Sequence, residues 1–374
     1  MGVRQEVLSK LREQQGFVSG QQICEELGIS RTAVWKAVGR LREEGYVIES
    51  VPNRGYRLAG SAGEGLLNEA ELAHYLAETR WAGHPALYRG ETGSTNEDVM
   101  RLADEGSPAG TLVVADRQTR GRGRRGRSWV SPDGSNVYMS LLLRPSMAAG
   151  LVPMVTLVTA LAVCETAQAL SGGAGGCLYG IKWPNDIVVR SDAEPDWKKV
   201  CGILTELRLE EREIRDVTIG VGLNVNMTEF PEEIRDTATS MRNAAGGAGI
   251  DRALLVGRIW ERFEEVYELF EKAGSLAPLK ERYEAVLVNR GRRVRVLDPK
   301  APFDGMAVGI SDTGELAVQL SSGAFSALSS GAASGGENPQ IPQCAQGAGA
   351  PSAEPEIVYV SAGEVSVRGV EGYV

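Results

Sequence analysis

The chain has few histidines and no paired cysteines. His74 and His84 are its two histidines, too few for a histidine-based metal centre and a poor basis for Ser-His-Asp catalysis. The five cysteines are widely spaced and contain no CxxC pair, which argues against a zinc site and a disulfide framework. Chemistry must therefore come from arginine, lysine, aspartate, asparagine and backbone groups, and the thiols predict a reducing, cytoplasmic environment.

Long apolar runs are also scarce. The first residues are charged and amphipathic instead of forming an apolar run behind basic residues, so we expect no signal peptide. The longest uncharged stretch, PSMAAGLVPMVTLVTALAVC at 145–164, contains glycine, proline, serine and threonine. This composition favours a buried helix over a membrane span, so no membrane partner is expected.

Length and charge indicate more than one domain. A chain of 374 residues exceeds one ordinary core and predicts two or three domains. The formal net charge is -9, yet residues 1–60 hold nine Lys or Arg against seven Glu, a balance of +2. Residues 1–60 are mildly basic and the rest of the chain is acidic, which indicates that the two parts have separate functions.

The N-terminal part predicts three helices and a hairpin. Ser19 and Ser30 are N-cap residues before two helical patterns, and Gly28 ends the first of them. The second pattern has one apolar face and one polar, basic face, which is typical of a recognition helix for the major groove. The turn PNRG adds a basic wing tip. The expected DNA contacts are Arg31, Thr32, Trp35, Lys36, Arg40 and Arg54.

Two alternatives to DNA binding through these residues stay open for this winged helix. Such domains also dock proteins, and Trp35 is large enough to belong partly to the core. One recognition helix reads too few base pairs for useful specificity, so we expect a dimer on a two-fold operator.

The segment RGRGRRGR, residues 120–127, concentrates five arginines and three glycines. It follows the predicted buried strand TLVVADRQ at 111–118 and precedes a predicted strand pair around PDGSN at 132–136, so it is a loop between strands. RGG segments that bind single-stranded nucleic acid are long and repeated, unlike this one. Glycine N–H groups and guanidinium forks suit an anion, so we predict a nucleotide-phosphate loop that is mobile when empty. It matches neither a Walker P-loop nor a dinucleotide fingerprint.

Three further stretches carry signals of different strength. Ser94 and Glu97 form a capping-box pattern before a helix, for which capping alone is the default explanation. KWPND at 182–186 is ordinary turn chemistry, although the adjacent Trp and Lys suggest a ligand wall. TIGVGLNVN at 218–226 is a glycine-spaced strand that permits close backbone approach.

GRGRRGRSW, STN, KWPND and KKVCGILTEL, in this order behind a winged helix, resemble the bifunctional biotin–protein ligase and biotin operon repressor family of bacteria. The resemblance implies that biotin and ATP, with Mg²⁺, react to biotinyl-AMP, which then biotinylates a lysine of the biotin carboxyl carrier protein. It also implies a homodimer that forms on ligand binding, with biotinyl-AMP as corepressor, and that represses biotin genes at operator DNA.

The same resemblance implies roles for individual residues. Arg124, Lys199 and Asp186 are expected to be catalytic, with Asp186 also the metal ligand. Trp129 and Trp183 are expected as walls of the site. The expected biotin-binding residues are Ser94, Thr95, Asn96, Gln118, Arg122, Gly123, Arg124 and Lys199. The expected ATP-binding residues are Gly121, Arg122, Arg124, Trp129 and Asn185. The longer connection RSDAEPDW leaves Lys198 as an alternative to Lys199.

The implied fold is a multidomain α+β protein. It has a winged helix-turn-helix at 1–60, a linker at 61–66 and a catalytic domain at 67–275, a mixed sheet with helices on one side that is similar to class II aminoacyl-tRNA synthetases. A small SH3-like barrel is expected at 276–374. It contains an insertion at 321–355, where 25 of 35 residues are Gly, Ala, Ser or Pro; we expect it to be disordered and without a role in ligation.

Two other functions remain to be tested. A lipoate–protein ligase shares the lysine-directed adenylate chemistry, although the arginine loop and KWPND argue against it. A non-catalytic transcription regulator that senses a small anion is the second alternative, and the combination of Arg124, Asp186 and Lys199 argues against that.

Overall fold

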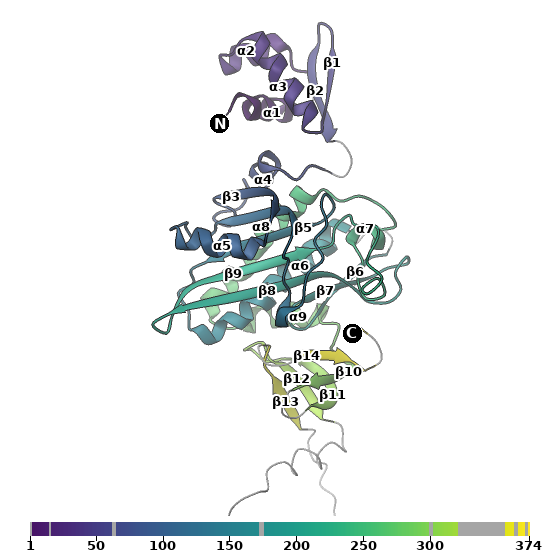
Figure 1. Ribbon diagram of the computed structural model, residues 1–374. Helices are drawn as coiled ribbons and strands as arrows, with labels where there is room; N and C mark the ends of the chain where they lie inside the picture. The colour runs from purple at the N-terminus through teal and green to yellow at the C-terminus, as the bar shows by residue number, and fades with distance from the viewer. Residues whose placement is uncertain are drawn as a thin grey trace, which may run out of the picture.

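The computed structural model describes residues 2–14, 16–61, 65–171, 176–298, 302–320, 356–362, 366–370 and 373–374. The expected insertion at 321–355 and residues 62–64 of the expected linker lie outside this part of the chain. The described strands form three sheets, which follow one another along the molecule from the N-terminal head to the C-terminal unit (Figure 1).

The N-terminal head is the expected helix-turn-helix with a hairpin. Ser19 and Ser30 accept capping hydrogen bonds from the backbone of Gln22 and Ala33, and Gly28 ends its helix in the left-handed conformation, as predicted. Trp35 is 67% exposed, so it is not part of the core. The elements are α1 (Val3–Glu13), α2 (Gly20–Leu27), α3 (Arg31–Glu43), β1 (Tyr46–Val51) and β2 (Gly55–Ser61).

A short helix, α4 (Glu69–Tyr75), joins the head to the body. The Asn68 side chain caps its start by accepting from the Glu71 N–H. Ala70 packs against the core of the head, while the helix also packs against α8 (Arg252–Ala273) of the body. The helix therefore contacts both parts.

The body is built on a mixed seven-stranded sheet with the order β3-β4-β5-β9-β8-β7-β6. β3 and β4 run parallel, and the other neighbours are antiparallel. The strands are β3 (Ala86–Thr92), β4 (Leu112–Gln118), β5 (Val137–Leu143), β6 (Leu178–Lys182), β7 (Asp186–Arg190), β8 (Lys198–Glu210) and β9 (Glu213–Leu223).

Helices cover both faces of this sheet. α6 (Val152–Ser171) and α8 pack on one face in the main core. α5 (Thr95–Asp104) packs on the other face, where Val113 and Leu142 alternate with strand residues that face the main core. The expectation that helices lie on one side alone is therefore wrong. α6 is apolar and long enough to span a membrane, but 67% of its most apolar window is buried in the protein, which confirms a core helix.

The segment before β5 is not the strand pair expected around PDGSN. The Trp129 N–H donates to the carbonyl of Gly121 at 2.9 Å, and the Gly123 N–H donates to the carbonyl of Arg127 at 2.7 Å. The backbone of this segment is therefore paired with the arginine loop itself, and β5 is the only strand that follows within the described residues 119–143.

The C-terminal unit is a five-stranded antiparallel sheet with the order β13-β12-β11-β10-β14. Asp251 caps the preceding long helix α8, and Gly274 ends it in the left-handed conformation. The remaining elements are α7 (Met241–Ala244), α9 (Lys280–Val286), β10 (Arg293–Leu297), β11 (Phe303–Ile310), β12 (Leu316–Leu320), β13 (Ile357–Val360) and β14 (Ser366–Gly369). α9 packs against β6 of the body.

Candidate functional site

Two cavities adjoin beside the arginine loop. One has a volume of about 1010 Å³ and the other about 50 Å³. Both are lined by Gly123, Arg124, Trp129, Asn185 and Lys199. These shared residues therefore lie at the junction of the larger and the smaller cavity. Two reactants bound one in each cavity would meet there.

All eight expected biotin-binding residues line the smaller cavity. The parallel pairing of β3 with β4 places Thr92 opposite Gln118, so the start of α5 lies beside the end of β4. The Gln118 Oε1 accepts from the Thr95 N–H at 2.9 Å and from its hydroxyl at 3.2 Å. Asn96, which is 5% exposed, donates to Glu206 at 2.6 Å. The structure therefore fixes these polar groups by mutual hydrogen bonds.

The capping box expected at Ser94 is wrong. Ser94 occupies the N-cap position of α5, but its side chain makes no capping hydrogen bond. The first N–H of the helix, that of Thr95, is instead satisfied by Gln118 from the neighbouring strand. The Ser94 hydroxyl is thus not used for capping, and it lines the smaller cavity.

A floor of glycines supports Trp129. Gly202 on β8 and Gly222 on β9 are directly paired in the sheet. A Cβ at Gly222 would lie 2.6 Å from the Trp129 Nε1, and one at Gly202 would lie 3.0 Å from its Cζ3. The indole therefore rests on a surface that only glycine leaves free, which confirms the close approach predicted for the glycine-spaced strand.

The arginine loop is compact in the structure. Residues 124–126 form a 3-10 turn, and a bridge pairs Arg122 with Ser128. Glu97 lies 2.8 Å from Arg120, which offsets part of the self-repulsion of the loop. Arg122 has more distant carboxylate neighbours, at 3.8 Å in Glu97 and 3.7 Å in Glu206. The loop therefore leaves Arg122 near the smaller cavity without a close ion pair to Glu97 or Glu206.

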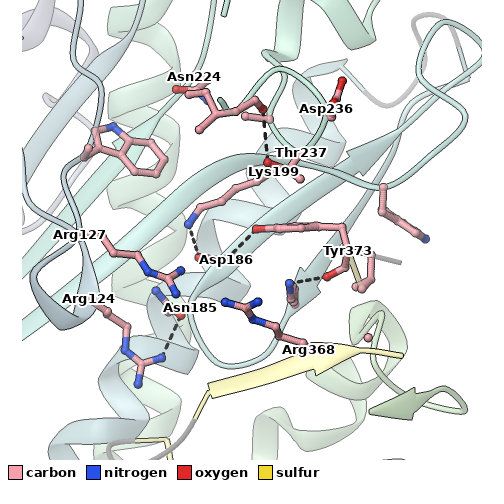
Figure 2. A pocket seen from close by; sticks show the side chains of 18 of the residues that line it. Arg124, Arg127, Asn185, Asp186, Lys199, Asn224, Asp236, Thr237, Arg368 and Tyr373 are labelled. Carbon is pink, nitrogen blue, oxygen red and sulfur yellow. Dashed lines mark hydrogen bonds and ion pairs between the residues drawn. The ribbon is translucent and has the colours of Figure 1, made fainter. Parts of the chain in front are cut away.

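Arg124 and Lys199 line both cavities, and Figure 2 shows Arg124 beside Asn185 and Lys199 beside Asp186. Arg124 donates to the Asn185 Oδ1 at 3.1 Å and to the carbonyl of Ala362. Lys199 Nζ lies 2.6 Å from the Asp186 Oδ1 and 5.1 Å from the centroid of the Trp129 ring. Lys198 instead pairs with Glu194 at 2.7 Å, away from the junction. The geometry therefore favours Lys199 of the two lysines.

Burial shifts the pKa of two cations at this site. Burial lowers the pKa of the Arg124 guanidinium, although the nearby Asp186 raises it. Burial also lowers the pKa of Lys182 to about 8, again against the opposing effect of Asp186. Partly dehydrated cations interact more strongly with an anion than solvated ones do. The site is thus suited to anionic groups.

Sequence reasoning missed several residues of the larger cavity. A loop after β9 contributes apolar and polar side chains, and the C-terminal unit contributes others (Figure 2). The missed residues include Asn224, Met227, Phe230, Ile234, Asp236, Thr237, Arg368 and Tyr373. Lys182, which KWPND suggested as part of a ligand wall, does line this cavity, whereas the missed residues are brought in by tertiary contacts.

Two expected residues are placed differently from the rest. Gly121 is not among the described residues that line either cavity. Its carbonyl accepts from the Trp129 N–H, so Gly121 stabilises the loop without lining the site. Trp183 borders the larger cavity but is 2% exposed, and its indole N–H donates to the carbonyl of Gly314 at 3.0 Å. Trp183 is therefore a core residue rather than an open wall.

The donor set around Asp186 does not fit a protein-held metal centre. Within the described residues, no group of three or more His, Cys, Asp or Glu side chains is placed to hold a metal ion. The Asp186 carboxylate already pairs with Lys199 and accepts from the Tyr373 hydroxyl at 3.1 Å. One engaged carboxylate is too little for a resident ion.

The six expected DNA contacts of the head are all exposed. Arg54 at the hairpin lies over the Phe17 ring at 4.6 Å, which restricts where its guanidinium points. The recognition face therefore combines cations with the exposed indole of Trp35.

Comparisons with known proteins agree with this arrangement. The Biotin/lipoate A/B protein ligase family matches residues 92–224, an HTH domain matches 3–57, and the Biotin protein ligase C terminal domain matches 291–368. The chain is 41% identical over 309 residues to the bifunctional ligase/repressor BirA of Bacillus subtilis, covering 82% of this chain and 90% of that relative. The chain belongs to the biotin protein ligase family.

Two further members of the family support the assignment. The bifunctional ligase/repressor BirA of Escherichia coli is 31% identical over 307 residues, which covers 81% of this chain and 88% of the relative. The solved structure of the biotin protein ligase from Aquifex aeolicus in complex with biotin and ATP has a TM-score of 0.57 and 29% identity, over 76% of this chain and 98% of that one.

Proposed function

We propose that this chain activates biotin with ATP to biotinyl-AMP and transfers biotin to a lysine of the biotin carboxyl carrier protein. The observation that carries the proposal is the set of eight expected biotin-binding residues, all of which line the small cavity beside the large one. The bifunctional relatives and the ligase with bound biotin and ATP support the same assignment.

The chemistry follows from the charges at the junction. The biotin carboxylate attacks the α-phosphate of ATP, a bond forms between carboxylate oxygen and phosphorus, and pyrophosphate leaves. Both reactants are anions, so the approach needs positive charge that is already in place. Arg124 and Lys199 line both cavities and supply it. The carrier lysine then attacks the acyl carbon and releases AMP.

Specific roles are proposed for the remaining site residues. The polar groups of Ser94, Thr95, Asn96 and Gln118 bind the ureido ring, and Arg122 and Gly123 contact biotin from the loop. Trp129 and Asn185 bind the nucleotide, and Gly121 acts by shaping the loop. Mg²⁺ would be held mainly by the ATP phosphates, because magnesium commonly keeps few protein ligands. Asp186, which lines the larger cavity, is the one carboxylate that we propose as its protein contact.

We also propose that the head binds operator DNA of biotin genes through the six exposed residues of its recognition face, and that biotinyl-AMP promotes a homodimer on that operator. Ordering of ligand-binding loops would lower the entropic cost of pairing. Sedimentation with and without biotinyl-AMP tests this step: an unchanged mass contradicts it. A cytoplasmic location stays a prediction.

The finer fold assignments belong to the same proposal. We assign the described seven-stranded sheet to the class II synthetase-like type and the five-stranded sheet to an SH3-like barrel. The proposed domains remain 1–60, 61–66, 67–275 and 276–374.

Biotin-dependent exchange of pyrophosphate into ATP tests the proposed function. A ligase should catalyse exchange with biotin and not with lipoate, followed by transfer to the carrier. Exchange with lipoate alone would support the lipoate alternative, and no exchange with either acid would support a non-catalytic regulator.

A further inference from the structure

The C-terminal residues supply a partner to the carboxylate beside Lys199. The Tyr373 hydroxyl donates to the Asp186 Oδ2 at 3.1 Å, while the Asp186 Oδ1 pairs with the Lys199 Nζ at 2.6 Å (Figure 2). Both oxygens of Asp186 are thus engaged, one on each side. The orientation of this carboxylate depends on a residue 187 positions away in the sequence.

Tyr373 is itself anchored to the body by Lys182. The Lys182 Nζ lies 3.5 Å from the centroid of the Tyr373 ring and also donates to the Tyr373 carbonyl. Lys182 is 7% exposed and the adjacent Val374 is 5% exposed. A cation over an aromatic face is stabilising, more so when it is partly dehydrated. The contact between Lys182 and Tyr373 is therefore largely buried within the protein.

The Tyr373 hydroxyl is a neutral hydrogen-bond donor, so it can hold the Asp186 carboxylate without adding a second negative charge.

Tyr373 forms a wall of the larger cavity and does not fill it. The cavity of about 1010 Å³ remains with Tyr373 in place, at the upper end of the volumes of small-molecule sites.

We propose that Tyr373 is a positioning residue for biotin activation: it holds the Asp186 carboxylate so that Asp186 keeps the Lys199 ammonium at the junction of the two cavities. This inference rests on the proposed ligase function. Without the hydroxyl, one oxygen of Asp186 loses its partner and the carboxylate can rotate, carrying Lys199 with it. Misplacement of a catalytic group by about 1 Å can cost about 100-fold in rate.

The first test compares two tyrosine variants in the full-length chain. Tyr373→Phe removes the hydroxyl and keeps the ring over Lys182. Tyr267→Phe is the matched control, because its hydroxyl donates to Glu271 at 3.3 Å within α8 and it lines neither cavity. We expect Y373F to lower kcat for biotin-dependent ATP–pyrophosphate exchange by about 10-fold to 100-fold, with KM for biotin unchanged. We expect Y267F to retain the wild-type kcat.

A double-mutant cycle separates positioning from a general structural effect. If Tyr373 acts through Asp186, the Y373F substitution should have little further effect in an Asp186→Asn background that still shows measurable exchange. Equal fold-losses in both backgrounds would overturn the proposal, as would a Y373F variant with wild-type kcat. A lower KM for ATP in Y373F would overturn it too, because Tyr373 would then be an obstruction. A wild-type chain without exchange would overturn the ligase function as well.

Discussion

Arg124 is the residue whose loss should affect activation most directly. It is half-buried at the junction of the cavities, and its guanidinium already bonds to Asn185. We expect Arg124→Ala to lower biotin-dependent exchange by at least about 100-fold, because removal of one preorganised charge has effects of that size. Arg124→Lys should recover little, since an ammonium lacks the planar fork.

A matched control for that prediction is Arg101→Ala. Arg101 forms exposed ion pairs on α5 with Asp98 and Glu105 and lines neither cavity. Its removal should leave exchange within about twofold of the wild type, since such pairs contribute little. An Arg124→Ala variant as active as this control would remove Arg124 from the mechanism.

The lowered pKa of Lys182 predicts that nucleotide binding depends on pH. Burial lowers its pKa to about 8, so the ammonium loses its proton as the pH rises through that value. The charged form is therefore present below about pH 8 and lost above it. We expect KM for ATP to rise between pH 7 and pH 9, measured by exchange at saturating biotin.

The control for the Lys182 prediction is Lys182→Arg, which keeps its charge at every pH in that range. Its KM for ATP should show a flatter dependence on pH. If the wild type and the arginine variant respond identically, the effect arises from another group.

At the scale of strands, the glycine floor under Trp129 determines the shape of the small cavity. Gly222→Ala places a Cβ 2.6 Å from the indole nitrogen, so Trp129 must move. We expect biotin affinity measured by calorimetry to fall at least about 10-fold, with a loss of stability of about 1–3 kcal/mol from overpacking. Gly150→Ala is the control, since nothing lies within 4 Å of a Cβ there.

The elements also show what a sequence can predict and why the rest escapes it. The caps at Ser19 and Ser30 depend on neighbours in the chain, and the structure confirms them. The predicted cap at Ser94 is wrong, and the next residue, Thr95, donates its N–H to Gln118, 23 residues away, a contact that no local pattern shows. Tyr373 escapes for the same reason, because its partner Asp186 is 187 residues distant.

The site residues divide along the same line. The expected residues of the small cavity were identified by motifs, and the structure brings all eight together. The loop that contributes Met227, Phe230 and Ile234 carries no comparable motif, and its place on the larger cavity depends on tertiary packing. The sequence motifs therefore predicted the residues of the small cavity better than those of the larger cavity, which come from distant segments of the chain.

At the scale of the whole molecule, the contact between head and body depends on a pair of charges. Arg12 of the head donates to Glu71 of α4, and their side chains are 18% and 9% exposed. The Tyr46 hydroxyl also accepts from Asn68 at 3.4 Å, close to this pair. Since α4 packs against α8 as well, this contact links the head to the body, and we expect it to set the orientation of the recognition face relative to the seven-stranded sheet.

That orientation matters because a dimer on a two-fold operator must place both recognition helices at a fixed spacing. Glu71→Gln leaves a poorly solvated Arg12 without a carboxylate partner, which costs up to about 3–5 kcal/mol when a pair is fully buried and less here. We expect calorimetry to show the head unfolding at a lower temperature, and electrophoretic mobility shifts to show weaker operator binding in the presence of biotinyl-AMP. Biotin-dependent exchange should stay at the wild-type rate, because Glu71 lines neither cavity.

Glu13→Gln, which breaks the more exposed pair of Glu13 with Lys10, should change none of these three measurements. A Glu71→Gln variant that bound the operator as tightly as Glu13→Gln would show that α4 does not set the position of the head.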